Sequence, residues 1–269
     1  MGVEGRAVTT VCWILGASDP EMGCIQMHLE RVEAHVIYAT VGARRVHPGN
    51  AYRADAPELP KGIATVYAVE CGWEDEGANV VHIDHHRPGD PGFGRPPEEF
   101  FAASSIGQVF HALAFAGTPS HEMVLVAAAD HCLGAAYRGE CPGVDPDELM
   151  EWRAASRAKF QGRSVERILE DVASAQQALR QADIITLAPD VCVRDMRCDE
   201  PVPELPEAAM RLGISYVSGP LKSPDGRWKF TMSGMPDEVR AFLEVWAPAC
   251  GLVGLYGDPA RGFAGGYAP

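Results

Sequence analysis

An acid and two imidazoles come directly after an apolar run of strand length in the segment Val80-Val81-His82-Ile83-Asp84-His85-His86. Side chains that emerge where a parallel strand ends lie at the edge of an α/β sheet at which ligands bind. Carboxylate and neutral imidazole suit the transition ions that activate water. The segment therefore predicts half of a metal site, and other strand ends must supply further carboxylates.

More acids follow three other predicted strands. Asp19 and Glu21 follow the strand expected at 8–15, Glu70 follows 62–69, and Asp130 with His131 follows 123–129. Taken singly, an Asp after a strand is as readily a helix cap as a ligand. Taken together at one sheet edge, these groups favour a site for one or two divalent ions, which can generate hydroxide and neutralise a phosphoryl group.

Several neighbouring residues have two alternative roles. His82 lies on the same strand face as Asp84, and His131 adjoins Asp130, so each is a ligand or a structural histidine. Arginines in the surrounding loops either clamp a phosphate or are solvated; they are residues 44, 45, 87 and 95.

The elements that must position these residues alternate along the chain. Strands are expected at 8–15, 34–41, 62–69, 80–83 and 123–129, and helices at 19–33 and 98–116. This order predicts an α/β fold with a mostly parallel sheet flanked by helices. Two helices are expected within 145–182. A Pro-rich segment at 201–206 then separates a first domain, 1–182, from a smaller α/β domain, 205–269, with strands at 214–217 and 228–232 and a helix at 236–246.

Composition limits the class of protein. The chain has 269 residues, of which 46% are hydrophobic, so it can bury a sizeable core. Its net charge of −14 argues against binding long duplex nucleic acid, whereas a small anionic substrate held by a metal and a few basic residues fits. Neither a signal peptide nor an apolar run of about 20 residues is present, which predicts a cytoplasmic protein without a membrane partner and leaves the oligomeric state open. The eight cysteines include no Cys-x-x-Cys pair and are expected to be reduced core thiols.

In order and spacing, these motifs resemble the DHH phosphoesterase superfamily, which includes single-strand exonucleases, oligoribonucleases, cyclic-dinucleotide phosphodiesterases and manganese-dependent pyrophosphatases. The family's Asp-x-Asp motif corresponds to Asp19-Pro20-Glu21, and its second acid to Glu70. Its third motif is Asp84-His85-His86, and its fourth acid is Asp130. The chain departs from the family at Glu21 and Glu70, where aspartates are usual, and at Leu15, where the phosphodiesterase branch has a histidine.

The resemblance implies roles for these residues. Mn²⁺ or Mg²⁺, as one or two ions, would be bound by Asp19, Glu21, Glu70, His85 and Asp130, with His131 as an added ligand in place of the missing imidazole. Asp84 would support His85, and His86 would contact the phosphate. The family's Gly-rich substrate loop resembles the C-terminal segment, so Arg261, Gly262, Gly265 and Gly266 would bind the substrate.

The function implied is that of a metal-dependent phosphoesterase, which hydrolyses a phosphoester or phosphoanhydride bond in a nucleotide-like or short oligonucleotide substrate. The divergent acids also allow a second hypothesis, in which the metal centre is altered and the protein binds a nucleotide or runs non-hydrolytic chemistry on a phosphorylated metabolite. A third hypothesis is a mononuclear zinc or iron enzyme that uses His82, His85, His86 or His131.

Overall fold

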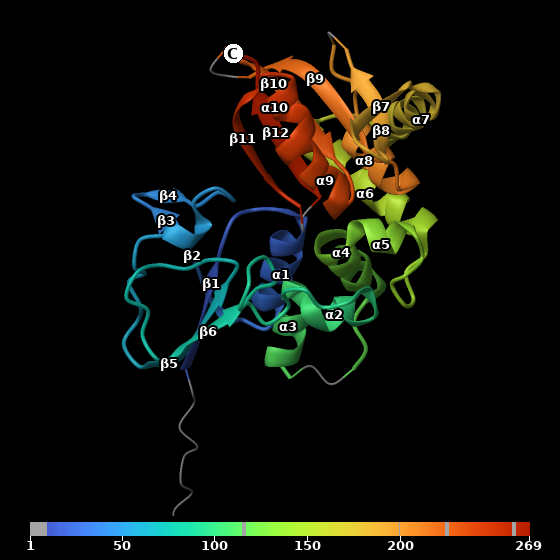
Figure 1. Cartoon of the computed structure of the whole chain (residues 1–269). Helices are drawn as coiled ribbons and strands as arrows, with labels where there is room; N and C mark the ends of the chain where they lie inside the picture. Colours follow the sequence, from blue (N-terminus) through green and yellow to red (C-terminus); the bar gives the residue numbers. More distant parts are fainter. Residues whose placement is uncertain (1–9, 115–116, 199, 224–225, 260–261) are drawn as a thin grey trace, which may run out of the picture. The chain divides into compact units, whose positions relative to one another are not determined.

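The protein is described from a computed structural model that covers residues 10–114, 117–198, 200–223, 226–259 and 262–269 (Figure 1). The chain separates into two compact units, and the division falls between Leu149 and Met150. The sequence pattern groups the helical segment up to residue 182 with the first domain. In the structure, the part of this segment after Leu149 belongs to the second unit.

The first unit contains a four-stranded, fully parallel sheet with the strand order β2-β1-β5-β6. Its strands are β1 (Thr10–Leu15), β2 (His35–Tyr38), β5 (Ile63–Val69) and β6 (Val80–Ile83). The sequence predicted each of these four strands. The connection from β1 to β2 contains a helix, as is usual between parallel neighbours, whereas β5 and β6 are joined by residues 70–79 without a helix.

Helices gather on one side of this sheet (Figure 1). They are α1 (Pro20–Arg31), α2 (Phe100–Ala103), α3 (Ser105–Ala112), α4 (His121–His131) and α5 (Leu133–Tyr137), with a 3₁₀ turn, η2 (Pro97–Glu99), before α2. On the other face, Cys12, Ile14 and Val66 pack against residues between Ala39 and Ala54. That segment contains β3 (Thr40–Val41), β4 (Arg44–Arg45) and η1 (Ala51–Arg53).

The predicted strand at 123–129 is wrong, because these residues form most of the helix α4. Ser120 caps the helix by accepting a hydrogen bond from Met123 N at 3.3 Å. The helix is buried on several sides, so its sequence shows an unbroken apolar run rather than an amphipathic stripe. Asp130 and His131 therefore lie in the last turn of a helix and not at the end of a strand.

The second unit is built on a six-stranded sheet with the order β11-β12-β10-β9-β8-β7. The strands are β7 (Ile184–Ala188), β8 (Val191–Arg197), β9 (Tyr216–Lys222), β10 (Trp228–Ser233), β11 (Val253–Asp258) and β12 (Phe263–Tyr267). Only β8 and β9 pair in parallel among these strands. The helices are α6 (Pro146–Gln161), whose first turn precedes the division, α7 (Val165–Gln181), α8 (Leu205–Leu212), α9 (Pro236–Ala241) and α10 (Ala247–Ala249), with a π-turn, η3 (Phe242–Trp246).

This second unit has a core of its own, in which Val217 and Met232 of the sheet pack with Val239 and Phe242. The mixed α/β class, with a parallel sheet flanked by helices and a second unit rich in strands, is therefore confirmed. Within the described parts of the chain, none of the helices combines the length and the apolar character that crossing a bilayer requires.

Candidate metal centre

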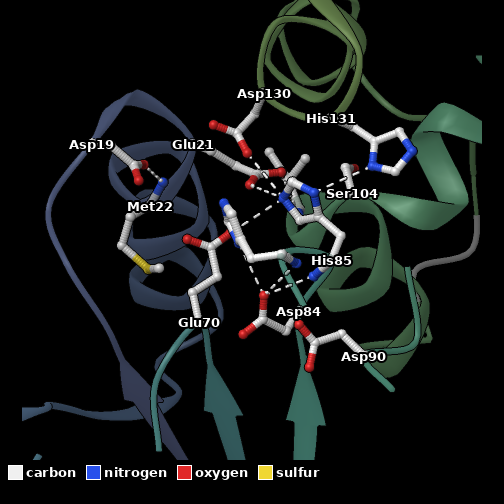
Figure 2. A network of polar contacts seen from close by, with 12 residues as sticks. Asp19, Glu21, Met22, Glu70, Asp84, His85, Asp90, Ser104, Asp130 and His131 are labelled. Carbon is white, nitrogen blue, oxygen red and sulfur yellow. Dashed lines mark hydrogen bonds and ion pairs between the residues drawn. The ribbon is translucent and has the colours of Figure 1, made fainter. Parts of the chain in front are cut away.

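The candidate residues lie in the first unit, where β1, β5 and β6 end. Asp19 and Glu21 follow β1 at the start of α1, Glu70 follows β5, and His85 follows β6. The carboxyl ends of parallel strands meet at one edge of the sheet, and α4 adds Asp130 from its last turn. Figure 2 shows Glu21, Glu70 and Asp130 directed toward the His85 ring, whereas the Asp19 carboxylate faces Met22.

His85 is the centre of the cluster. Its Nε2 lies 2.9 Å from Asp130 Oδ2, 3.6 Å from Glu70 Oε1 and 3.7 Å from Glu21 Oε2. The His85 side chain is 4% exposed and that of Glu21 is 1% exposed. Three acids that are distant in sequence thus converge on one buried nitrogen.

Three of the converging atoms make no hydrogen bond of good geometry within the described residues, although His85 Nε2 lies 2.9 Å from Asp130 Oδ2. They are His85 Nε2, Glu70 Oε1 and Glu21 Oε2, and each is buried. Buried polar atoms are normally satisfied, so a group of unsatisfied atoms that face one another calls for a ligand. One atom each from Glu70, His85, His86 and Asp130 lies within 4.8 Å of the others. Carboxylate oxygens suit Mn²⁺ or Mg²⁺ and imidazole nitrogen suits a transition ion, so the residues present fit a divalent cation.

The pKa shifts of the side chains in the cluster also favour a bound cation. Burial acts to lower the pKa of His85, but the contacts of its ring with the carboxylates of Asp130, Glu21 and Glu70 outweigh it and raise that pKa to about 12. Burial, together with the charge of Asp130, raises the pKa of Glu21 well above its ordinary value. Burial and the charge of Glu70 raise the pKa of Asp19 to about 7. Accumulated negative charge of this kind is relieved by a proton or by a cation.

Asp84 organises the turn after β6. Its Oδ1 accepts hydrogen bonds from His85 N at 2.7 Å, from His86 N at 3.0 Å and from His86 Nδ1 at 3.0 Å. Its Oδ2 accepts one from Tyr52 Oη at 2.9 Å. Burial acts to raise the pKa of Asp84, but these hydrogen bonds outweigh it and lower the pKa to about 2. Asp84 therefore contacts the side chain of His86, whereas it contacts only the backbone of His85.

His131 contacts the opposite side of the His85 ring from the acids. Its Nε2 lies 3.2 Å from the carbonyl oxygen of Arg95, which can only accept, so this nitrogen carries the hydrogen. His131 Nδ1 is then the acceptor for His85 Nδ1–H at 3.3 Å. That arrangement leaves His85 Nε2 for a cation, as is typical of a histidine that is oriented by a second residue. The structure thus places His131 behind the predicted ligand and not among the converging atoms.

Asp19 and Glu21 are both fixed by helix termini. Asp19 caps α1, because its Oδ1 accepts a hydrogen bond from Met22 N at 2.7 Å, and Pro20 occupies the first turn. Glu21 Oε1 accepts one from Ile106 N at 2.9 Å, near the N-terminus of α3. A helix N-terminus favours a carboxylate, so Glu21 is held with its second oxygen directed toward His85.

Glu70 has a constrained backbone. Its φ is 50°, in the left-handed region that residues other than glycine rarely adopt. Gly16, in the loop after β1, passes so close to Glu70 that a Cβ at position 16 would overlap the Glu70 carbonyl oxygen. The glycine therefore lets the loop that leads to Asp19 approach the second acid.

Other predicted residues lie outside the cluster. His82 pairs with Glu76, with 2.6 Å between His82 Nε2 and Glu76 Oε2. Arg87 stacks over the Tyr52 ring at 3.3 Å, and Arg95 pairs with the exposed Glu99. Arg45 donates from Nε to Gly16 O at 2.9 Å, and its buried Nη2 has no partner within the part of the chain that the structure describes.

The predicted Gly-rich loop is largely a strand. Gly265 and Gly266 lie in β12, which pairs with β10 on one side and β11 on the other. A Cβ at Gly265 would overlap the Tyr256 hydroxyl, so tight packing explains that glycine better than loop flexibility does. Gly262 has a φ of 73° just before the strand, and Arg261 lies outside the described residues. A substrate-binding role for this segment stays a prediction.

Two residues that contact the site carry no sequence signal. Tyr52 comes from a long polar segment 32 residues before Asp84. Gln108, in α3, donates from Nε2 to the carbonyl oxygens of Asp84 and Ala103. A polar residue on a helix is usually solvated, and neither residue has a spacing that marks it.

No family model matches the chain, and no curated protein is significantly similar to it in sequence. Among solved structures, a pGpG-specific phosphodiesterase, PggH from Vibrio cholerae, is similar at 11% sequence identity and a TM-score of 0.48. The match covers 96% of this chain and 92% of that one. A likeness this weak defines neither the fold nor the function.

Proposed function

We propose that the first unit is a divalent-metal hydrolase, and more specifically a DHH-type phosphoesterase that uses Mn²⁺ or Mg²⁺. Its substrate would be a nucleotide-like molecule or a short oligonucleotide, cleaved at a phosphoester or phosphoanhydride bond. The observation that carries the proposal is the convergence of Glu21, Glu70 and Asp130 on His85 Nε2, with buried atoms that make no hydrogen bond of good geometry among the described residues. The motif order that resembles the DHH superfamily supplies the reaction class.

Glu70, His85 and Asp130 would hold the cation. Glu21 Oε2, 3.7 Å from the same His85 nitrogen, would complete the set, and Asp19 adds negative charge close by, since burial and the charge of Glu70 raise its pKa. A bound divalent ion lowers the pKa of water and neutralises charge on a phosphoryl group. The chain's own contribution is to fix these donors, because Glu21 is held by the α3 N-terminus and the His85 ring by His131.

His86 is the residue that we assign to the phosphate. Asp84 contacts its Nδ1, so the ring is oriented, and Nε2, for which the described residues supply no hydrogen bond, would contact a substrate oxygen beside the cation, of which His86 is itself a candidate ligand. The hydrogen bond with Asp84 raises the pKa of His86, which favours the charged form that binds an anion. Arg45 would add a second cation, because its buried Nη2 lacks a partner within the described residues and its pKa responds to Asp19.

The proposal is tested by stripping the purified chain with a chelator and restoring Mn²⁺ or Mg²⁺. Product release is then measured on cyclic dinucleotides, short oligonucleotides, mononucleotides and pyrophosphate. We expect hydrolysis of at least one class only with metal present, and a loss of about 100-fold or more for His85→Ala. His82→Ala is the matched control, because His82 pairs with Glu76 outside the cluster, and it should keep its activity.

The same experiment separates the proposal from an altered metal centre. Metal content is measured after reconstitution and dialysis. If the chain holds a cation in a His85-dependent manner but releases no product from any of the substrates, the hydrolytic assignment is wrong and a nucleotide-binding role becomes the better description. If no cation binds, the metal site itself is refuted.

A further inference from the structure

We propose that Cys132 and Cys141 form a reversible disulfide, which makes this pair a site of oxidative modification next to the candidate metal centre. Their Sγ atoms lie 3.1 Å apart. A disulfide has an S–S distance of about 2.05 Å, so the two sulfurs need to approach by only about 1 Å. The expectation of reduced core thiols does not account for this contact, and Cys192, Cys198 and Cys250 are exposed rather than part of a core.

The local backbone holds the two thiols together. Cys132 lies between α4 and α5, and the chain then forms the five residues of α5 and turns back. Gly139, with a φ of 76°, makes the turn, and Glu140 N donates to Ala135 O at 3.0 Å. The approach of Cys141 to Cys132 is thus fixed by main-chain hydrogen bonds and a left-handed glycine, not by a chance contact of two side chains.

A metal does not explain the pair. A structural zinc site takes four ligands, usually cysteine and histidine. Across the described ranges, one group of three or more metal-ligating side chains is found, and it consists of Glu70, His85, His86 and Asp130 without either cysteine. Two thiols in contact without further ligands are suited to oxidation.

Oxidation of the pair takes two steps. Cys132 is partly exposed, whereas Cys141 is buried with an exposed fraction of 2%. A peroxide of the hydrogen peroxide class oxidises one of the two thiols to a sulfenic acid and is reduced to water. The other thiol then attacks that sulfur, the S–S bond forms and a second water leaves. In sum, two thiols and one H₂O₂ give one disulfide and two H₂O.

Oxidation would act on the end of α4, because Cys132 follows Asp130 by two residues. This consequence rests on the proposed function, since it assumes that Asp130 binds a cation. The disulfide itself does not depend on that assumption. We infer that the oxidised and reduced chains differ in their affinity for Mn²⁺.

The test treats the full chain with a small excess of H₂O₂, alkylates the free thiols under denaturing conditions and digests with trypsin. Arg138 lies between the two cysteines, so the digestion separates them unless a disulfide joins the peptides. We expect a linked pair that dithiothreitol releases. Cys141→Ser should abolish it, and Cys250→Ser, which removes an exposed thiol elsewhere, should leave it intact. If Cys132 and Cys141 are recovered alkylated and separate while Cys250 is oxidised, the proposal is overturned.

The Kd for Mn²⁺ is then measured before and after oxidation. A change of about threefold or more that dithiothreitol reverses supports the effect on the metal centre, and an unchanged Kd refutes it. If the reduced chain binds no Mn²⁺, the proposed function fails, while the linked peptides still decide whether the disulfide forms.

Discussion

Asp84 is only 1% exposed. Its carboxylate accepts hydrogen bonds from the backbone N–H groups of His85 and His86, from the His86 ring and from the Tyr52 hydroxyl. A buried carboxylate with so many donors fixes the geometry of the turn that carries His85 and His86. Hydrogen bonds to a charged group contribute more than neutral ones, about 1.5–3 kcal/mol each. Asp84 therefore supports both the local fold and the orientation of the residue assigned to the phosphate.

We expect Asp84→Asn to lower the free energy of unfolding by about 2–3 kcal/mol, because an amide has one acceptor oxygen and places an N–H₂ group among donors. Denaturation in urea measures this change. The variant should also reduce hydrolysis by about tenfold or more, since the His86 ring loses its charged partner. Glu74→Gln, which removes a carboxylate from an exposed position on the same unit, should change the stability by less than about 0.5 kcal/mol. An Asp84→Asn chain as stable and active as the parent would contradict the role assigned to this network.

Individual residues show which parts of the site could be predicted from the sequence and which could not. The acids at positions 19, 21 and 70 and the histidine at 85 could be located because each follows a strand whose apolar run is visible in the sequence. Tyr52 and Gln108 could not, since their contacts with Asp84 are set by tertiary packing over 32 and 24 residues. The separate roles of His85 and His131 depend on which ring nitrogen faces which partner, which spacing alone does not determine.

At the scale of the elements, the positions of α1 and β5 depend on how closely the loop at Gly16 can approach the backbone of Glu70. A Cβ at this position would overlap the carbonyl oxygen of Glu70, so the loop before α1 would have to move away from the second acid. Gly23, in α1, offers a comparison, because a Cβ there meets nothing within 4 Å.

We expect Gly16→Ala to destabilise the chain by about 2 kcal/mol or more and to weaken Mn²⁺ binding, since overlap with the backbone displaces both elements. Gly23→Ala should instead stabilise the chain by about 0.5–1 kcal/mol, because alanine is the better helix former, and leave the metal affinity unchanged. Urea denaturation and Mn²⁺ titration of the two variants provide the comparison. Equal effects of both substitutions would show that the approach of the loop to Glu70 is unimportant.

Strands and helices with a recognisable apolar run or composition were predictable from the sequence, and the buried helix α4 was not. The strands β1, β5 and β6 were found from apolar runs that end at glycine or at an acid, and the helices α6 and α7 from their composition and the break at Gly162. The helix α4 was mistaken for a strand because burial on several sides removes the helical stripe. Its cap, Ser120, and the alanines at its end were the signals that favoured a helix.

At the scale of the whole molecule, the raised pKa values of the site make stability depend on pH. Asp19, with a pKa of about 7, keeps a proton in the folded state that an unfolded Asp loses near pH 4. His85, with a pKa of about 12, contributes stability that is complete below about pH 6.5 and is lost as the pH rises toward 12. In both cases the folded state binds more protons, so these groups make stability fall with rising pH.

We therefore expect the free energy of unfolding of the chelator-treated chain to fall between pH 5 and pH 9. Saturating Mn²⁺ should reverse this trend, because the cation competes with those protons and binds the folded state more tightly as the pH rises. Urea denaturation across this pH range, with and without Mn²⁺, measures both slopes. His85→Gln, which cannot be protonated at this position, should flatten the curve of the chelator-treated chain. A stability that rises with pH in the absence of metal would contradict the arrangement of charges described here.

The imidazolium of His85 also has a consequence for how the protein is made in the cell. Because a proton on this ring offsets the surrounding acids once the first unit is folded, the folded chain carries an internal counter-ion before any metal binds. If the proposed cation binds, maturation would consist of an exchange, in which the incoming ion displaces hydrogen ions from the folded chain. Supply of the ion would consequently govern how many molecules are active and not how many survive biosynthesis.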